Sequence, residues 1–120
     1  MAVLSTGQST GAQDKLVINN DCDETSDNNV FSSSATLYSI RIENPHGSAV
    51  AFVKLYDNVA PAVGTTDPDI ILSAPANKVI TWVMQAGVSM DSVSMACLST
   101  AGTAGTTTPT GTIDVRLSAK

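Results

Sequence analysis

The sequence has little charge, and long hydrophobic runs are missing; each shortage excludes a class of protein. Charged residues make up 14% of the chain, below the roughly 25% usual for soluble domains. The formal net charge is −5 and the six lysines and arginines are spread singly, so we expect no direct nucleic-acid binding, which needs a basic stripe. No apolar run approaches the roughly 20 residues that span a bilayer, and the first residues do not resemble a signal peptide. We therefore expect no membrane partner and synthesis in a cytoplasm.

Cysteine is scarce as well. Cys22 and Cys97 are the two cysteines, and they lie far apart in the sequence. Neither belongs to a CxxC pair or has a neighbouring histidine, so the spacing does not support a zinc site or a redox motif. Because disulfides are rare in proteins made in a cytoplasm, we expect free, partly buried thiols, with a disulfide between the two as the alternative.

The groups that catalysis needs are also few. The single histidine, His46, lies in the turn Asn44-Pro45-His46-Gly47, where solvent would leave its chemistry ordinary. Serine and threonine are plentiful, but no GxSxG or SxxK motif gives a hydroxyl an activating partner. The glycines follow no phosphate-binding motif that would indicate a nucleotide. We expect no enzyme, no catalytic residue and no cofactor.

Two clusters of oxygen-bearing residues are candidates for a cation site. The segment Asp21-Cys22-Asp23-Glu24-Thr25-Ser26-Asp27 could chelate calcium, because hard cations bind several carboxylate and carbonyl oxygens of one short loop. It lacks the glycine and the final glutamate of an EF-hand loop, so a solvated acidic loop is the preferred interpretation. In Thr65-Thr66-Asp67-Pro68-Asp69, aspartate before proline is typical of a turn. We expect no metal site in either segment.

Short apolar runs separated by turn-forming residues predict strands, not helices, from Lys15 onward. The predicted strands are residues 15–19, 35–43, 49–56, 77–85 and 111–118. In the second of these, Tyr38, Ile40 and Ile42 are expected to share one face, with polar residues on the other. The last one alternates in the same way, with its charged residues toward water.

Two predicted strands, 49–56 and 77–85, carry apolar residues on both faces. For the second, a central position in a sheet or a subunit contact would explain the pattern. Its tryptophan, Trp82, is expected in the core more than at an interface. The turn at residues 44–47 combines proline and glycine between two well-patterned strands, which predicts a hairpin.

The overall pattern predicts one all-β domain. Residues 1–14 are rich in glycine, serine, threonine and glutamine and are expected to form a flexible arm. Residues 15–120 are expected to form a single antiparallel β-sandwich, with a jelly roll as the nearest architecture. Long polar loops, which usually serve contacts, are expected at residues 20–29, 58–68 and 99–110.

Several short motifs follow one another in a distinctive order. They are Leu37-Tyr38-Ser39-Ile40, Asn44, Lys54-Leu55-Tyr56-Asp57, Val63-Gly64-Thr65 and Pro68, then more loosely 70–72, Gly87-Val88-Ser89-Met90, Ala96-Cys97 and the closing strand. In this order they resemble a family of small phage virion β-sandwich proteins over residues 35–118. That family includes capsid decoration or cement proteins and, less often, parts of the neck or tail.

The resemblance implies a decoration protein that binds the outer surface of the major capsid protein lattice and stabilises the shell of a bacteriophage virion. It further implies a homo-oligomer, with a homotrimer expected, and Trp82 and the two-faced strands as candidate contact surface. Two alternatives stay open: a neck, tail or fibre-base protein of the virion, and a module that binds carbohydrate or a host surface.

Overall fold

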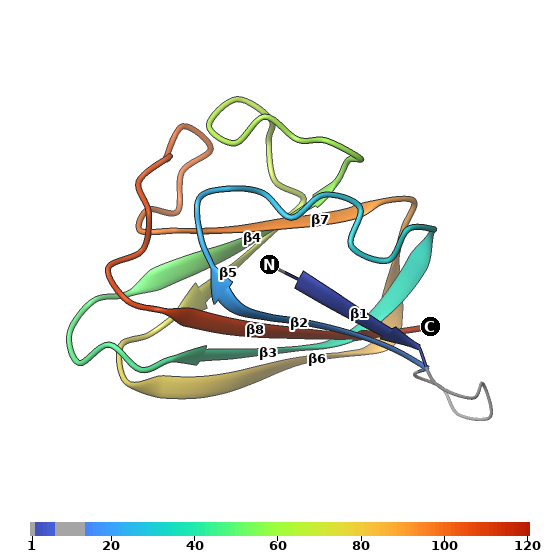
Figure 1. Ribbon diagram of the computed structural model, residues 1–120, viewed down its shortest axis with the longest axis horizontal. Helices are drawn as coiled ribbons and strands as arrows, with labels where there is room; N and C mark the ends of the chain where they lie inside the picture. The colour runs from blue at the N-terminus through green and yellow to red at the C-terminus, as the bar shows by residue number, and fades with distance from the viewer. Residues whose placement is uncertain (1, 7–13) are drawn as a thin grey trace.

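Strands account for all the regular structure in the part of the chain that the computed structural model describes, residues 2–6 and 14–120 (Figure 1). The strands are β1 (Ala2–Thr6), β2 (Lys15–Cys22), β3 (Ala35–Asn44), β4 (Ala51–Asp57), β5 (Ile70–Ala74), β6 (Lys78–Met90), β7 (Val93–Leu98) and β8 (Ile113–Ala119). The described residues include no helix long and apolar enough to cross a membrane. All five strands predicted from the sequence are present, whereas β1, β5 and β7 were missed because they are short and, in β7, buried without alternation.

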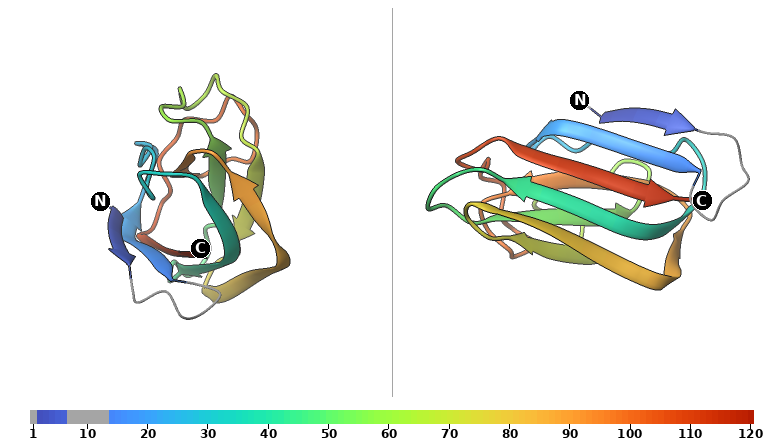
Figure 2. Two further views of the ribbon diagram at one scale, coloured as in Figure 1. Left: turned by 90° about the vertical axis from the view of Figure 1, so that its right-hand side faces the viewer. Right: turned by 90° about the horizontal axis from the view of Figure 1, so that it is seen from below.

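The strands form two antiparallel sheets that pack face to face (Figure 2). One sheet has the order β1-β2-β8-β3-β6 and the other has the order β5-β4-β7. Both sheets contribute to one buried core, whose larger members include Val17, Leu37, Ile40, Ile42, Val53, Leu55, Met95, Ile113, Val115 and Leu117. The expected antiparallel β-sandwich is therefore confirmed.

The strands pair in a nested order. β2 pairs with β8, β3 with β6 and β4 with β5, so the chain resembles one long hairpin rolled up on itself. Between β2 and β3, the segment 23–30 takes the place of a strand along β7. Asp27 and Met95 exchange backbone hydrogen bonds of 2.8 and 3.0 Å, and the Cys97 amide donates to the Asp23 carbonyl oxygen at 2.8 Å. This nested pairing across two sheets is the arrangement of a jelly roll.

β3 alternates as predicted except at Tyr38. Ile40 and Ile42 are buried in the core, but Leu37 takes the inward position before them and Tyr38 is only half-buried. The register of β3 against both neighbours shifts between Leu37 and Ser39, which is a β-bulge. The prediction that Tyr38 shares a face with Ile40 and Ile42 is wrong, because the bulge interrupts the period of two on which it was based.

The turn after β3 does not close a hairpin. β3 and β4 lie in different sheets, so residues 45–50 cross from one layer to the other. Buried Asn44 holds the crossing: its side-chain amide donates to the carbonyl oxygens of Ala49 and Ala74 at 2.9 and 2.8 Å, and its Oδ1 accepts from the His46 amide at 3.2 Å. The predicted hairpin is wrong because turn residues indicate a change of direction, not the strand with which the next one pairs.

The two strands with apolar residues on both faces occupy different positions. β4 is central in its sheet, with Val53 in the main core and Tyr56 buried on the outer side. β6 is an edge strand, and Val79 and Val83 on its outer side are 53% and 67% exposed. The central-strand interpretation is wrong for β6, and a subunit contact there stays a prediction.

Part of the segment expected to be an arm is a strand. β1 pairs antiparallel with β2, from Ala2 opposite Asn19 to Thr6 opposite Lys15. β1 is ordered by its hydrogen bonds with β2, and the composition of the segment does not reveal that partner. The flexible arm stays a prediction for residues 1 and 7–13, which lie outside the described residues.

Candidate interaction surface

The outer face of the three-stranded sheet is covered by loops of the same chain. Residues 58–69 and 99–112 gather over β4 and β7, at the top of Figure 1. Beneath them, buried Tyr56 and Leu98 belong to a small second core, against which Val63 of the first loop packs. The loops therefore cover this face over β4 and β7, while Ile71 on the edge strand β5 is 42% exposed.

Polar contacts hold these loops in place. Lys54, on the outer side of β4, is fully buried, and its Nζ donates to the Gly102 carbonyl oxygen at 2.5 Å. The Thr103 hydroxyl donates to Asp67 Oδ1 at 2.8 Å, which joins the two loops. Burial lowers the pKa of Lys54 and raises the pKa of Tyr56, because loss of solvent disfavours the charged form of each group. Of these two groups, Lys54 hydrogen-bonds to a loop, whereas the Tyr56 hydroxyl is buried without a hydrogen-bond partner among the described residues.

The outer face of the five-stranded sheet carries no such cover, and we call it the open face. Seen from below in the right-hand view of Figure 2, the five strands lie side by side with no described segment in front of them. Strand register aligns outward residues in rows across the sheet. One row runs, from β1 to β6, through Val3, Ile18, Arg116, Arg41 and Thr81. Charge therefore lies in the middle of the open face, with apolar residues toward its margins.

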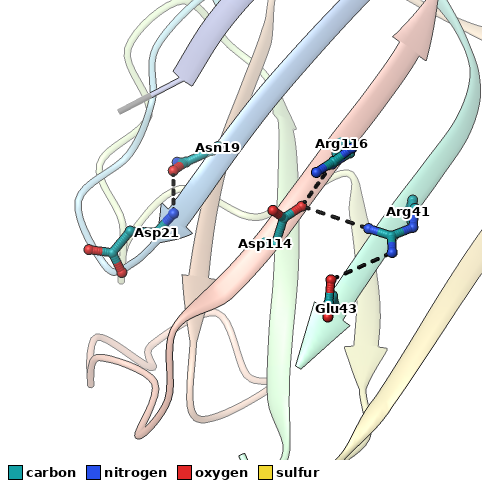
Figure 3. A network of polar contacts seen from close by, with 6 residues as sticks. All are labelled: Asn19, Asp21, Arg41, Glu43, Asp114 and Arg116. Atoms are coloured by element: carbon teal, nitrogen blue, oxygen red, sulfur yellow. Dashed lines mark hydrogen bonds and ion pairs between the residues drawn. The ribbon is translucent and has the colours of Figure 1, made fainter. Parts of the chain in front are cut away.

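The centre of the open face is a network of two arginines and two carboxylates (Figure 3). Arg41 Nη2 lies 3.5 Å from Glu43 Oε2, and Arg41 Nη1 lies 4.0 Å from Asp114 Oδ1. Arg116 Nε donates to the same Asp114 oxygen at 3.1 Å. The four charges cancel. Such partly exposed ion pairs contribute about 1 kcal/mol or less each to stability. The four side chains can therefore break these pairs and bind groups of a docking surface at little cost in free energy.

One margin of the open face is the outer side of β6. Its 13 residues include one charged residue, Lys78, and no strand of the described residues pairs with its free edge. Trp82, expected in the core, lies opposite buried Ile40 and so on the core-facing side of β6, but the edge position leaves it 39% exposed. Long edge strands usually carry charge, proline or bulges that block pairing with another chain. In β6 the main interruption is a bend at Gly87, whose φ is +76°.

A hollow of about 290 Å³ lies where β3 begins and β6 ends. It is lined by Ser34, Ala35, Thr36, Ser89, Met90, Asp91 and Lys120. The hydroxyl oxygens of Thr36 and Ser89 lie 3.2 Å apart. The lining is thus mostly polar, with several hydroxyls, one carboxylate and one amine.

The acidic segment predicted as a solvated loop has a structural role along β7. Asp27 accepts a hydrogen bond from the side-chain amide of Asn19, and Asp23 Oδ1 accepts from the Thr25 amide at 2.9 Å. Burial raises the pKa of Asp27, although the hydrogen bond from Asn19 acts in the opposite direction. Across residues 2–6 and 14–120, no three His, Cys, Asp or Glu side chains are grouped so that they could hold a metal ion.

The other residues singled out from the sequence also hold turns. His46 Nδ1 accepts hydrogen bonds from the backbone amides of Ser48 and Ala49, at 3.2 and 2.9 Å. Asp69 Oδ2 accepts from the Asp57 amide at 2.6 Å. At the start of the predicted turn at residues 65–69, the backbone amides of Thr65 and Thr66 both donate hydrogen bonds to the Ala62 carbonyl oxygen.

The open face could not be assembled from the sequence. Alternation predicted that Arg41 and Glu43 of β3, and Asp114 and Arg116 of β8, point toward water. It gave no sign that β3 and β8, far apart in the chain, are neighbours in the sheet. The only sequence signal for this surface was the alternation of polar and apolar residues in each strand, and alternation does not say which strands are neighbours.

Comparison with known proteins yields no relative: no family model, no curated protein and no solved structure matches the chain.

Proposed function

We propose that the chain is a non-catalytic structural subunit of a bacteriophage virion, a capsid decoration or cement protein. In this proposal it is made in the host cytoplasm, binds the outer surface of the major capsid protein lattice and stabilises the shell. The observation that carries the proposal is the open face, an uncovered sheet surface with a charge-neutral centre, in a molecule whose opposite face is covered by loops over β4 and β7. The proposal involves no cofactor, nucleic acid or membrane.

The open face suits binding at many equivalent positions. A neutral centre with apolar margins can lie against a protein surface without leaving an unpaired charge buried. Each contact can be weak, because a shell offers the same position many times and oligomeric subunits bind at several points together.

Fold and motif order support the same proposal by analogy. Jelly rolls occur in viral capsid proteins and in lectins, so the nested strand order admits both a virion subunit and a sugar-binding module. Fold alone does not decide function. The motif order between residues 35 and 118, which resembles small phage virion proteins, favours the virion.

We further propose that copies of the chain associate, with a homotrimer as the expected form. The free edge of β6 supports this part of the proposal. Trp82 and Val83 are exposed there, and the strand carries no charge after Lys78, so copies could approach without electrostatic repulsion.

Binding to capsids assembled without the chain tests the proposal. We expect cryo-electron microscopy to find the purified chain at every equivalent lattice position. Val83→Asp, which places a charge on the open face, is expected to lower occupancy about tenfold or more. Circular dichroism and light scattering on the variant establish that it is folded and report its oligomeric state.

Val59→Asp is the matched control. Val59 is 59% exposed, close to the 67% of Val83, but it lies in the loop over the opposite sheet. Its occupancy should equal that of the unchanged chain. Equal losses in both variants, or no binding by the unchanged chain, would contradict docking through the open face.

The two alternatives predict other outcomes. Binding to a single ring of a particle would assign the chain to the neck, tail or fibre base. The hydroxyl-lined hollow beside Thr36 and Ser89 is the feature that favours a glycan-binding module. Binding on a glycan array that is lost in Asp91→Ala, together with no capsid binding, would establish that alternative.

A further inference from the structure

The two cysteines, distant in sequence, meet in the core. Cys22 ends β2 in the five-stranded sheet, and Cys97 lies in β7 of the three-stranded sheet. Both are free and buried, at 1% and 0% exposure, in the same hydrophobic cluster. They are more deeply buried than the sequence led us to expect.

Backbone geometry brings the two residues together. The Cys97 amide donates to the carbonyl oxygen of Asp23, the residue after Cys22, at 2.8 Å. The Cys97 side chain is also the largest cause of the raised pKa of Cys22, as expected of two thiols that lie close together. Disulfides require two cysteines whose backbones approach closely and whose side chains point at each other. The hydrogen bond beside Cys22 and the mutual influence of the two buried thiols point to such an approach.

We propose that Cys22 and Cys97 form an intramolecular disulfide that joins the two sheets when the protein meets an oxidising environment. The inference concerns the isolated chain and does not depend on the proposed function. It takes up the disulfide that the sequence left open as the alternative to free thiols.

The oxidant would be a small-molecule disulfide such as oxidised glutathione. One cysteine thiolate attacks the glutathione disulfide, forms a mixed disulfide and releases one glutathione thiolate. The second cysteine thiolate then attacks the mixed disulfide at the protein sulfur and releases the second glutathione. Two electrons pass from the cysteines to glutathione, and each cysteine loses one proton.

Burial controls the rate of this exchange. The hydrogen bond with Cys97 and the loss of solvent raise the pKa of Cys22, so little reactive thiolate exists in the folded state. The first step therefore proceeds from the unfolded chain or when the segment 23–30 moves away from β7. Oxidation should be slow in the native protein and faster in mild denaturant.

Refolding the full chain from urea in a buffer of reduced and oxidised glutathione tests the inference. We expect intact mass to fall by two hydrogen atoms, and peptide mapping to join the peptides of Cys22 and Cys97. Because the disulfide would close a loop over most of the chain, we expect the melting temperature to rise by about 10 °C or more. Reduction should reverse both changes.

Cys22→Ala and Cys97→Ala are matched variants, since either removes the disulfide and keeps the site small and apolar. In both, the same buffer should leave the melting temperature unchanged. If either variant is too unstable to fold, peptide mapping of the unchanged chain still decides the pairing. Cysteines that remain fully alkylatable after oxidative refolding, stable glutathione adducts on single cysteines, or a disulfide that lowers the melting temperature would each overturn the inference.

Discussion

At the scale of single residues, Lys54 is the most unusual side chain of the molecule. It is fully buried, and the hydrogen bond from its Nζ to the Gly102 carbonyl oxygen is the contact that holds it. A buried ammonium group normally needs a carboxylate or several acceptors, because loss of solvent disfavours its charge. Lys54 thus anchors the loop 99–112 at a cost in stability.

Replacing Lys54 by methionine should stabilise the protein at neutral pH. We expect Lys54→Met to raise the free energy of unfolding by about 1 kcal/mol at pH 7, because a similar apolar volume replaces a buried charge. Gly102 is an exposed residue, so its carbonyl group can then bind water. Urea unfolding monitored by circular dichroism measures the difference.

The same variant should reveal the lowered pKa of Lys54. Between this pKa and the ordinary lysine value of 10.5, the unfolded chain binds more protons than the folded one, so the stability of the unchanged protein rises with pH in this window. The advantage of Lys54→Met should shrink as pH rises from 7 toward 10. An advantage that stays constant or grows would contradict a desolvated ammonium group.

At the scale of strands, Asp114 links β8 to β3. Arg41 and Arg116 lie directly opposite each other on these strands, and Asp114 contacts both. Like charges at opposite positions of a strand pair are unfavourable. The Asp114 carboxylate therefore offsets the repulsion between the two arginines and stabilises the pairing of β3 with β8.

Asp114→Asn should lower the free energy of unfolding by about 0.5 to 1 kcal/mol at low salt, because Arg116 then faces Arg41 without the carboxylate that it contacts. The loss should shrink in high salt as the repulsion is screened. Glu43→Gln is the control: Glu43 contacts only Arg41 in this network, at 3.5 Å, so its loss should be smaller. Equal losses in both variants would argue against a special position of Asp114. Chemical unfolding at two salt concentrations measures both.

At the scale of the whole molecule, the two layers differ in what they present to solvent. Loops and a second small core cover one sheet, while the other presents the open face and the free edge of β6. The single tryptophan of the chain, Trp82, lies on that edge and is 39% exposed. Its fluorescence therefore reports contact at β6.

We expect acrylamide to quench the fluorescence of Trp82 readily in the dilute chain. Quenching should fall severalfold when copies associate through the edge of β6, because contact there removes the indole ring from solvent. A titration of protein concentration, with mass measured by light scattering, separates self-association from docking. Quenching that stays unchanged while copies associate would place the contact between copies away from β6.

The fold class and much of the core followed from local patterns. Period-two alternation located β3 and β8 and the inward positions of Ile40, Val115 and Leu117, because burial of one face imposes that period. Turn-forming residues marked most of the breaks between strands. Scarcity of charge, histidine and cysteine led to the expectation of a protein without an active site.

By itself, the sequence determined the strand pattern and the fold class, since both depend on residues close together in the chain. Only the tertiary structure decided strand order, the bulge at Tyr38, the edge position of β6 and the contact of Cys22 with Cys97. These features depend on pairings between segments far apart in sequence, which no local period encodes. The open face is one of them: its charged centre exists because the nested order of a jelly roll places the last strand beside β3.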